Sequence, residues 1–275
     1  INTRSFGEDR YNVTVKSYMY MKGMQDNGVM ASAKHFPAHG DTDVDSHKDL
    51  PVIPHNRLRL DSVELYPFQA LSDYGVGSMM VAHLNIPAID ARANRPTTLS
   101  EKTITGLLKE DLNFKGLVFT DALEMKGVTK HFDSGQVEAE ALVAGNHMLL
   151  LPESIEAALQ EIKRYLADGR LSQADLDERV RMILRAKYRL GLASFTSLPV
   201  ENVRAELNSP EAMSLKRRLL REALTLVRNR DQLIPFAELD SLQLASLSIG
   251  AGSKTLFQKR LDAYASFTHR QVGKA

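Results

Sequence analysis

Short apolar runs alternate with helical patterns through the first two thirds of the chain. Four runs, at residues 29–35, 77–83, 116–120 and 144–151, have the length of buried strands. Each is followed, after a loop, by a segment in which apolar residues recur every three or four positions. Strands that alternate with amphipathic helices are typical of a parallel sheet built from βα units. The pattern therefore predicts an α/β domain over residues 1–191.

Capping residues mark where several of these helices are expected to begin and end. Asp61 with Glu64 three residues later fits a capping box, and Ser100 and Ser172 suit the N-cap position. Gly191 suits the residue just after a helix. We therefore expect helices to begin after Asp61, Ser100 and Ser172, and the last of them to end at Gly191.

A second pattern begins after residues 192–209, which we interpret as a linker because periodicity lapses and turn-forming residues gather there. Beyond it we expect a helix from Pro210 to about Glu222, strands at 224–227 and 242–249, and a helix around 256–264. These elements are too few for an independent α/β core. Residues 210–275 are therefore predicted to be the truncated start of a second α/β domain.

Charge and composition exclude several classes of protein. With 35 Lys and Arg against 34 Asp and Glu, no basic field is available to bind a phosphate backbone, so no nucleic-acid partner is expected. The absence of Cys excludes disulfides and thiolate metal sites, and no apolar run is long enough to cross a membrane. Because the chain begins at Ile1 without a signal-like stretch, we expect its true start to lie upstream. The compartment is therefore not predicted, and bacterial cytoplasm and periplasm are both compatible.

Polar residues stand at the ends of three successive apolar runs. Lys34 and His35 end the first, His83 ends the second, and Asp121 ends the third. In parallel βα architectures the carboxyl ends of the strands form the active-site face. Any one of these residues could merely cap a helix or face solvent, but their joint occurrence favours function. A carboxylate at the end of an apolar strand is costly to bury unless it has a use, which favours Asp121 in particular.

The segment 34–47 is the part of the chain densest in histidine and aspartate. A metal site is one interpretation, with nitrogen and oxygen ligands from His35, His39, His47, Asp41, Asp43 and Asp45. The spacing fits neither a helical pair of histidines nor a calcium loop, so we predict no metal in this segment. The alternative is a proton-transfer dyad in which Asp45 orients His47.

Four segments carry a resemblance to a known family. They are KHFPAHGDT (34–42), DSH (45–47), MVAHL (80–84) and GLVFTDALEM (116–125). Together and in this order they resemble glycoside hydrolase family 3 in its β-N-acetylhexosaminidase branch, and the first two segments are highly specific to that branch. The resemblance covers about residues 1–190, and residues 224–235 resemble the entry to the second domain of many members.

The resemblance implies a (β/α)₈ TIM barrel followed by the start of a second α/β sandwich domain. In the family about three βα units precede the segment at Arg4, whereas only four clear strands are visible here before the linker. We therefore expect residues 1–191 to be part of a catalytic barrel, and the rest of its own longer chain to be its partner. We also expect residues 1–275 alone to be neither independently stable nor active, because parallel strand edges would be exposed.

The resemblance also implies a retaining mechanism in which Asp121 is the nucleophile, and it implies no cofactor or metal. His47, assisted by Asp45, takes the place of the second carboxylate found in most retaining glycosidases.

Further residues are implied to bind the substrate. Arg4, Lys34 and His35 correspond to family residues that bind the sugar hydroxyls and the N-acetyl group. His83 is added to the substrate-binding residues because it ends the second strand within a matching segment.

The expected reaction is hydrolysis that releases terminal β-linked N-acetyl-D-glucosamine, with peptidoglycan fragments as the expected source. Two alternatives stay open, namely phosphorolysis by the same residues and a silent barrel that serves as a binding module. Two positions depart from the family, with Ala38 where Gly is usual and His147 where Asp is usual at the end of the next strand.

Overall fold

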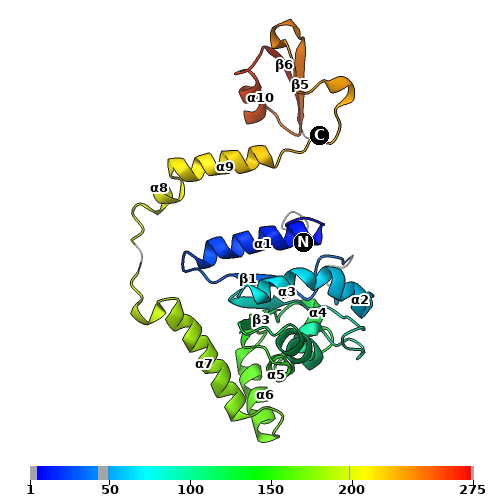
Figure 1. Ribbon diagram of the computed structural model, residues 1–275, viewed down its shortest axis with the longest axis vertical. Coiled ribbons are helices and arrows are strands. Elements are labelled where there is room, and N and C mark those ends of the chain that lie inside the picture. The colour runs from blue at the N-terminus through cyan, green and yellow to red at the C-terminus, as the bar shows by residue number, and fades with distance from the viewer. Residues whose placement is uncertain (1–4, 43–48, 198, 274–275) are drawn as a thin grey trace. The chain divides into compact units, whose positions relative to one another are not determined.

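The computed structural model describes residues 5–42, 49–197 and 199–273. The chain divides into two compact units, Ile1–Thr196 and Ser197–Ala275. The described part of the first unit holds a sheet of parallel strands in the order β1 (Ser32–Phe36), β2 (Ser78–Val81), β3 (Leu117–Ala122) and β4 (Met148–Leu150) (Figure 1). The predicted α/β arrangement of parallel strands is therefore confirmed.

Helices precede the first strand and follow each strand in turn. Helix α1 (Arg10–Gln25) leads into β1. The elements after the strands are α2 (Arg57–Arg59), η2 (Leu60–Glu64) and α3 (Tyr66–Asp73) after β1, η3 (Thr97–Leu99) and η4 (Lys102–Asp111) after β2, α4 (Lys126–Thr129) and α5 (Gln136–Ala144) after β3, and α6 (Ile155–Ala167) and α7 (Gln173–Arg189) after β4. All four parallel strands therefore end at the same edge of the sheet, where the loops to these helices begin.

The helices close over the sheet through their apolar faces. Val81 and Val118 in the central strands are fully buried, as is Leu108 of η4. The rings of Phe36 in β1 and Phe68 in α3 meet edge to face at 5.3 Å, and α1 lies beside α3 (Figure 1). Burial of each such side chain contributes about 1.5–3 kcal/mol to stability. This core fixes the strand ends that carry the candidate site.

Most of the predicted helix starts are confirmed, but one is wrong. The hydroxyl of Ser172 accepts the backbone N–H of Asp175, and the hydroxyl of Ser100 accepts that of Thr103. The helix expected to begin at Asp61 instead begins at Asn56, whose side chain accepts the N–H of Arg59. An asparagine caps as well as an aspartate does, so the earlier start adds a turn and places Asp61 within the π-helical η2.

The second unit contains fewer elements. They are α8 (Val203–Leu207), α9 (Pro210–Glu222), β5 (Leu244–Ile249), α10 (Leu256–Leu261) and β6 (Phe267–Val272), with single turns η6 (Arg230–Gln232) and η7 (Leu239–Ser241) between α9 and β5. A further single turn, η5 (Leu192–Ser194), follows α7 within the first unit. Strands β5 and β6 pair in parallel, but the strand predicted at 224–227 is wrong. Leu224 and Val227 are exposed, so no packing supports an extended pairing there. No helix in the described ranges is long and apolar enough to span a membrane.

A buried cluster of nitrogen-bearing side chains surrounds His147. We expected this residue at the end of the fourth strand, but that placement is wrong because it immediately precedes β4, at the amino end of the sheet. Its Nδ1 accepts the N–H of Val118 at 2.9 Å, and its Nε2 lies 3.1 Å from Nζ of Lys109. Arg179 donates to the carbonyls of residues 142 and 146 nearby. The cluster therefore brings two cations to the position where the family usually has an aspartate.

Hydrogen-bond geometry and burial both favour the uncharged forms of Lys109 and His147. Because Val118 donates to Nδ1, a neutral His147 ring carries its proton on Nε2 and presents it to Lys109. An ammonium group has no lone pair, so this contact favours the uncharged amine. Burial, together with the charge of Arg179, lowers the pKa of Lys109 to about 8, and burial beside both cations lowers the pKa of His147 to about 3.

Replacing His147 with aspartate should raise the stability of the complete protein by about 1–3 kcal/mol at neutral pH, because a carboxylate would pair with Lys109 while still accepting from Val118. The folded protein keeps His147 neutral down to about pH 3, whereas the unfolded chain protonates it below 6.5. Wild-type stability should therefore fall as pH decreases from 6.5 toward 3, by at most about 1.4 kcal/mol per pH unit.

Calorimetric Tm values between pH 5 and 7 check this prediction. His147→Asn is the matched control, because it has a similar side-chain size to aspartate but no charge. Equal Tm values for the Asp and Asn variants would show that a negative charge beside Lys109 and Arg179 adds no stability, which would contradict the prediction.

Candidate active site

Asp121 lies near the end of β3, at the carboxyl edge of the sheet. Its Oδ1 accepts the backbone N–H of Ala122 at 2.9 Å, and its side chain is 18% exposed. One oxygen is thus oriented by the backbone while the carboxylate stays accessible from outside. A carboxylate held in this way can act as a nucleophile or as an acceptor of hydrogen bonds from a ligand.

His35 lies beside Asp121, as the strand-end pattern predicted. Its Nε2 is 3.9 Å from Oδ2 of Asp121, and its ring meets that of His39 edge to face at 5.6 Å. Thr42 Oγ1 lies 3.3 Å from Nδ1 of His39. Lys34, the preceding residue of β1, is exposed. The structure therefore brings one carboxylate, from β3, and one imidazole, from β1, together at the same edge of the sheet.

His83 also lies just beyond its strand, but its side chain is completely buried. The ring Nδ1 is 2.7 Å from Oγ1 of Thr98, and Nε2 is 2.9 Å from the carbonyl oxygen of Ala122. From its buried position, His83 thus contacts Ala122, the residue that follows Asp121. The sequence predicted its position at a strand end but contained no signal for this burial.

Arg4, Asp45 and His47 lie outside the described residues. The chain on either side of residues 43–48 is described, and each side carries an ion pair. Asp41 is bonded to His55 Nε2 at 2.7 Å, and Asp49 is bonded to Lys130 at 2.9 Å. Both aspartates are largely exposed, at 62% and 53% of the side chain. These pairs connect the flanks of the segment to the helical region after β1 and to the region after β3.

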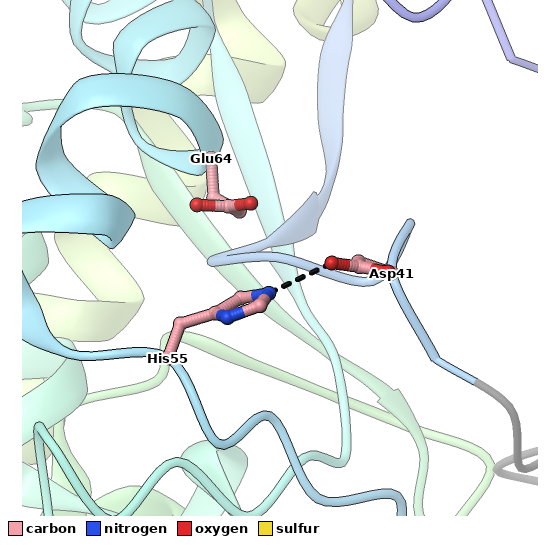
Figure 2. A group of neighbouring side chains, drawn as sticks. All are labelled: Asp41, His55 and Glu64. Carbon is pink, nitrogen blue, oxygen red and sulfur yellow. Dashed lines mark hydrogen bonds and ion pairs between the residues drawn. The ribbon is translucent and has the colours of Figure 1, made fainter.

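Asp41, His55 and Glu64 form a group with the donor atoms of a metal site (Figure 2). One ligand atom from each lies within 4.8 Å of the others, and an imidazole with two carboxylates suits a divalent transition metal. Protein contacts already engage these atoms, because Asp41 binds His55 and Glu64 pairs with Arg59 at 3.0 Å. Sequence reasoning did not identify His55 and Glu64 as candidate ligands, because their spacing from Asp41 along the chain matches no known metal-binding motif.

Alanine at position 38 is accommodated without backbone strain. Ala38 is buried, at 5% exposure, and it is not among the described residues with a positive φ. The departure from glycine therefore has no conformational cost at this position.

Comparisons with known proteins identify the family to which this chain belongs. Residues 1–186 match the family model described as the glycosyl hydrolase family 3 N terminal domain. Beta-hexosaminidase A of Pseudoalteromonas piscicida is 32% identical over 86% of this chain and 42% of its own length. A beta-N-acetylglucosaminidase/beta-glucosidase of Cellulomonas fimi is 30% identical over 85% of this chain and 43% of its own length. The chain belongs to glycoside hydrolase family 3.

A solved structure supports the same family membership. The family 3 beta-N-acetylglucosaminidase from Paenibacillus sp. str. FPU-7 superposes with a TM-score of 0.82 at 31% identity, covering 98% of this chain and 53% of that one. The chain thus spans about half the length of that protein and less than half that of the two curated relatives.

Proposed function

We propose that the protein containing this chain is a retaining β-N-acetylhexosaminidase that releases terminal β-linked N-acetyl-D-glucosamine. The observation that carries the proposal is the Asp121 carboxylate, oriented by Ala122 N–H and 18% exposed at the carboxyl edge of the sheet. Relatives named beta-hexosaminidase and beta-N-acetylglucosaminidase support the choice of sugar. Peptidoglycan fragments are the proposed natural source of the substrate.

In the proposed first step, an oxygen of Asp121 attacks the anomeric carbon of the sugar. The bond from that carbon to the leaving oxygen breaks, and the leaving oxygen takes a proton from His47. In the second step a water oxygen attacks the same carbon, gives a proton back to His47 and releases the aspartyl ester as a carboxylate. Asp45 is proposed to orient His47 through both steps, and the sugar keeps its β configuration.

Three of the four residues predicted to bind the substrate are proposed to contact the sugar, whereas the fourth, His83, is completely buried. Arg4, Lys34 and His35 would donate hydrogen bonds to the hydroxyls and the N-acetyl group. The described contact between His35 and Asp121, at 3.9 Å, supports a place for His35 beside the reacting carbon. The exposure of Lys34 on β1 leaves its amine available to a ligand.

The proposed setting of this site is a (β/α)₈ barrel that includes residues 1–191. Residues 192–209 would be a linker, and 210–275 would begin a second α/β domain. The parallel order of β1 to β4 supports the barrel, because neighbouring strands in such a barrel follow one another along the chain.

Product analysis of the complete protein tests the proposed function. With an N-acetylglucosaminide as substrate, we expect free N-acetylglucosamine whether or not phosphate is present, and proton NMR should show it first as the β anomer. Formation of the sugar 1-phosphate would favour phosphorolysis by the same residues. No turnover of any N-acetylglucosaminide would contradict the proposal.

A further inference from the structure

A fully buried imidazole, that of His83, contacts the backbone next to the proposed nucleophile. Its Nε2 is 2.9 Å from the carbonyl oxygen of Ala122, the residue next to Asp121. Its other nitrogen is 2.7 Å from the hydroxyl of Thr98, in η3. The side chain has 0% exposure, so the ring presents no surface to a ligand in the site.

A neighbouring carbonyl identifies one ring nitrogen that carries a proton. A carbonyl oxygen can only accept, so Nε2 carries a proton and donates it to Ala122. The carbonyl of Ala82 accepts the hydroxyl proton of Thr97 at 2.6 Å. The hydroxyl of Thr98 donates to the same carbonyl at 2.6 Å, and its oxygen lies 2.7 Å from Nδ1 of His83. His83 thus carries a proton on Nε2 and donates it to the Ala122 carbonyl.

Ala122 connects this ring to the carboxylate. Its N–H donates to Oδ1 of Asp121, and its carbonyl accepts both from His83 and from the N–H of Met125, at 3.2 Å. The N–H of Ala122 therefore orients the nucleophile, and the imidazole of His83 holds the carbonyl of the same residue. If His83 is removed, one bond that fixes this residue is lost, and Asp121 can move away from the angle of attack.

We infer that His83 is a positioning residue that orients Asp121 through Ala122, rather than a residue that contacts the sugar. The inference rests on the proposed function, in which Asp121 is the nucleophile. A displacement of about 1 Å in a reacting group can cost about 100-fold in rate, so the effect should be on turnover. Sugar binding, which uses other groups, should be largely unchanged.

Three variants of the complete protein test this inference. Glutamine places an amide N–H where Nε2 stands, asparagine places one nearer Nδ1, and leucine provides neither. With 4-nitrophenyl N-acetyl-β-D-glucosaminide, His83→Leu and His83→Asn should lower kcat by about 10- to 100-fold, whereas His83→Gln should retain most of it. The Ki of N-acetylglucosamine should stay within about twofold of wild type in all three.

Several outcomes would overturn the inference. A tenfold rise in Ki with kcat unchanged would make His83 a sugar-contacting residue, and wild-type kcat in the leucine variant would remove it from the reaction. If the His83 variants do not fold, Thr98→Val and Thr98→Ser provide a milder pair. The valine variant, which loses the hydroxyl that contacts Nδ1 of His83, should lower kcat relative to the serine variant, and equal kcat values would count against the inference.

Wild type and Asp121→Asn are measured in the same series. An inactive wild type, or a fully active Asp121→Asn, would overturn the proposed function itself, and it would do so independently of His83.

Discussion

Asp121→Asn should lower kcat of the complete protein on N-acetylglucosaminides by several orders of magnitude. An amide cannot form the glycosyl ester and then leave as a carboxylate, so the double displacement stops at its first step. The amide oxygen can still accept the N–H of Ala122, which holds Oδ1 at 2.9 Å in the wild type. The fold and the shape of the site should therefore survive, and the Ki of N-acetylglucosamine should change little.

Covalent labelling provides the decisive measurement for this prediction. A mechanism-based fluorosugar should accumulate as an ester on Asp121, which peptide mass spectrometry can locate. Asp175→Asn is a suitable control, because Asp175 lies in α7 and its side chain accepts from Ser172, well removed in sequence from the strand ends. A label found on any other residue would contradict the assignment of Asp121.

His47→Ala should have an effect that depends on the leaving group. A natural glycosidic oxygen needs a proton as it departs, so its turnover should fall by about 100-fold or more without the acid. An activated aryl group departs with little help and should be slowed far less in the first step. Asp45→Asn should give a weaker version of the same pattern, because it removes only the partner that orients the imidazole.

The pH dependence of the reaction follows from the double role of His47. The ring must be protonated to assist departure and neutral to activate water. The ordinary pKa of imidazole lies near neutrality, and a neighbouring carboxylate raises it, so the rate should peak at neutral or mildly acidic pH. Equal slowing of natural and activated substrates by His47→Ala would instead assign the acid to a carboxylate such as Glu124, which is exposed three residues after Asp121.

The features of this chain that could be predicted from its sequence depend on local pattern. The alternation of apolar runs and helical patterns predicted a parallel α/β arrangement because each element buries one face. The same reasoning put Asp121 and His35 at one edge, where they lie 3.9 Å apart. Strand pairing depends on partners, and this explains the two errors in the second unit, where β6 was missed and a strand at 224–227 was wrongly expected.

Contacts between distant segments could not be predicted in the same way. The burial of His83 depends on Thr98 and Ala122, which reach it from other loops. The approach of His55 and Glu64 to Asp41 depends on how the helices after β1 pack, which no motif records. His147 was assigned to the wrong end of its strand because a run of apolar residues does not show where the hydrogen-bonded ladder begins.

The two ion pairs that flank residues 43–48 make ionic strength a useful variable. The Asp41–His55 and Asp49–Lys130 pairs are partly open to solvent, so each contributes at most about 1 kcal/mol and dissolved salt screens it. The hydrogen bonds around Asp121 and His83 involve backbone groups and buried atoms, on which salt has little effect. Screening would weaken the contacts made on either side of the segment that contains His47. For an uncharged N-acetylglucosaminide, added salt should therefore slow cleavage of a natural linkage, which needs His47 as an acid, more than cleavage of an activated aryl glycoside.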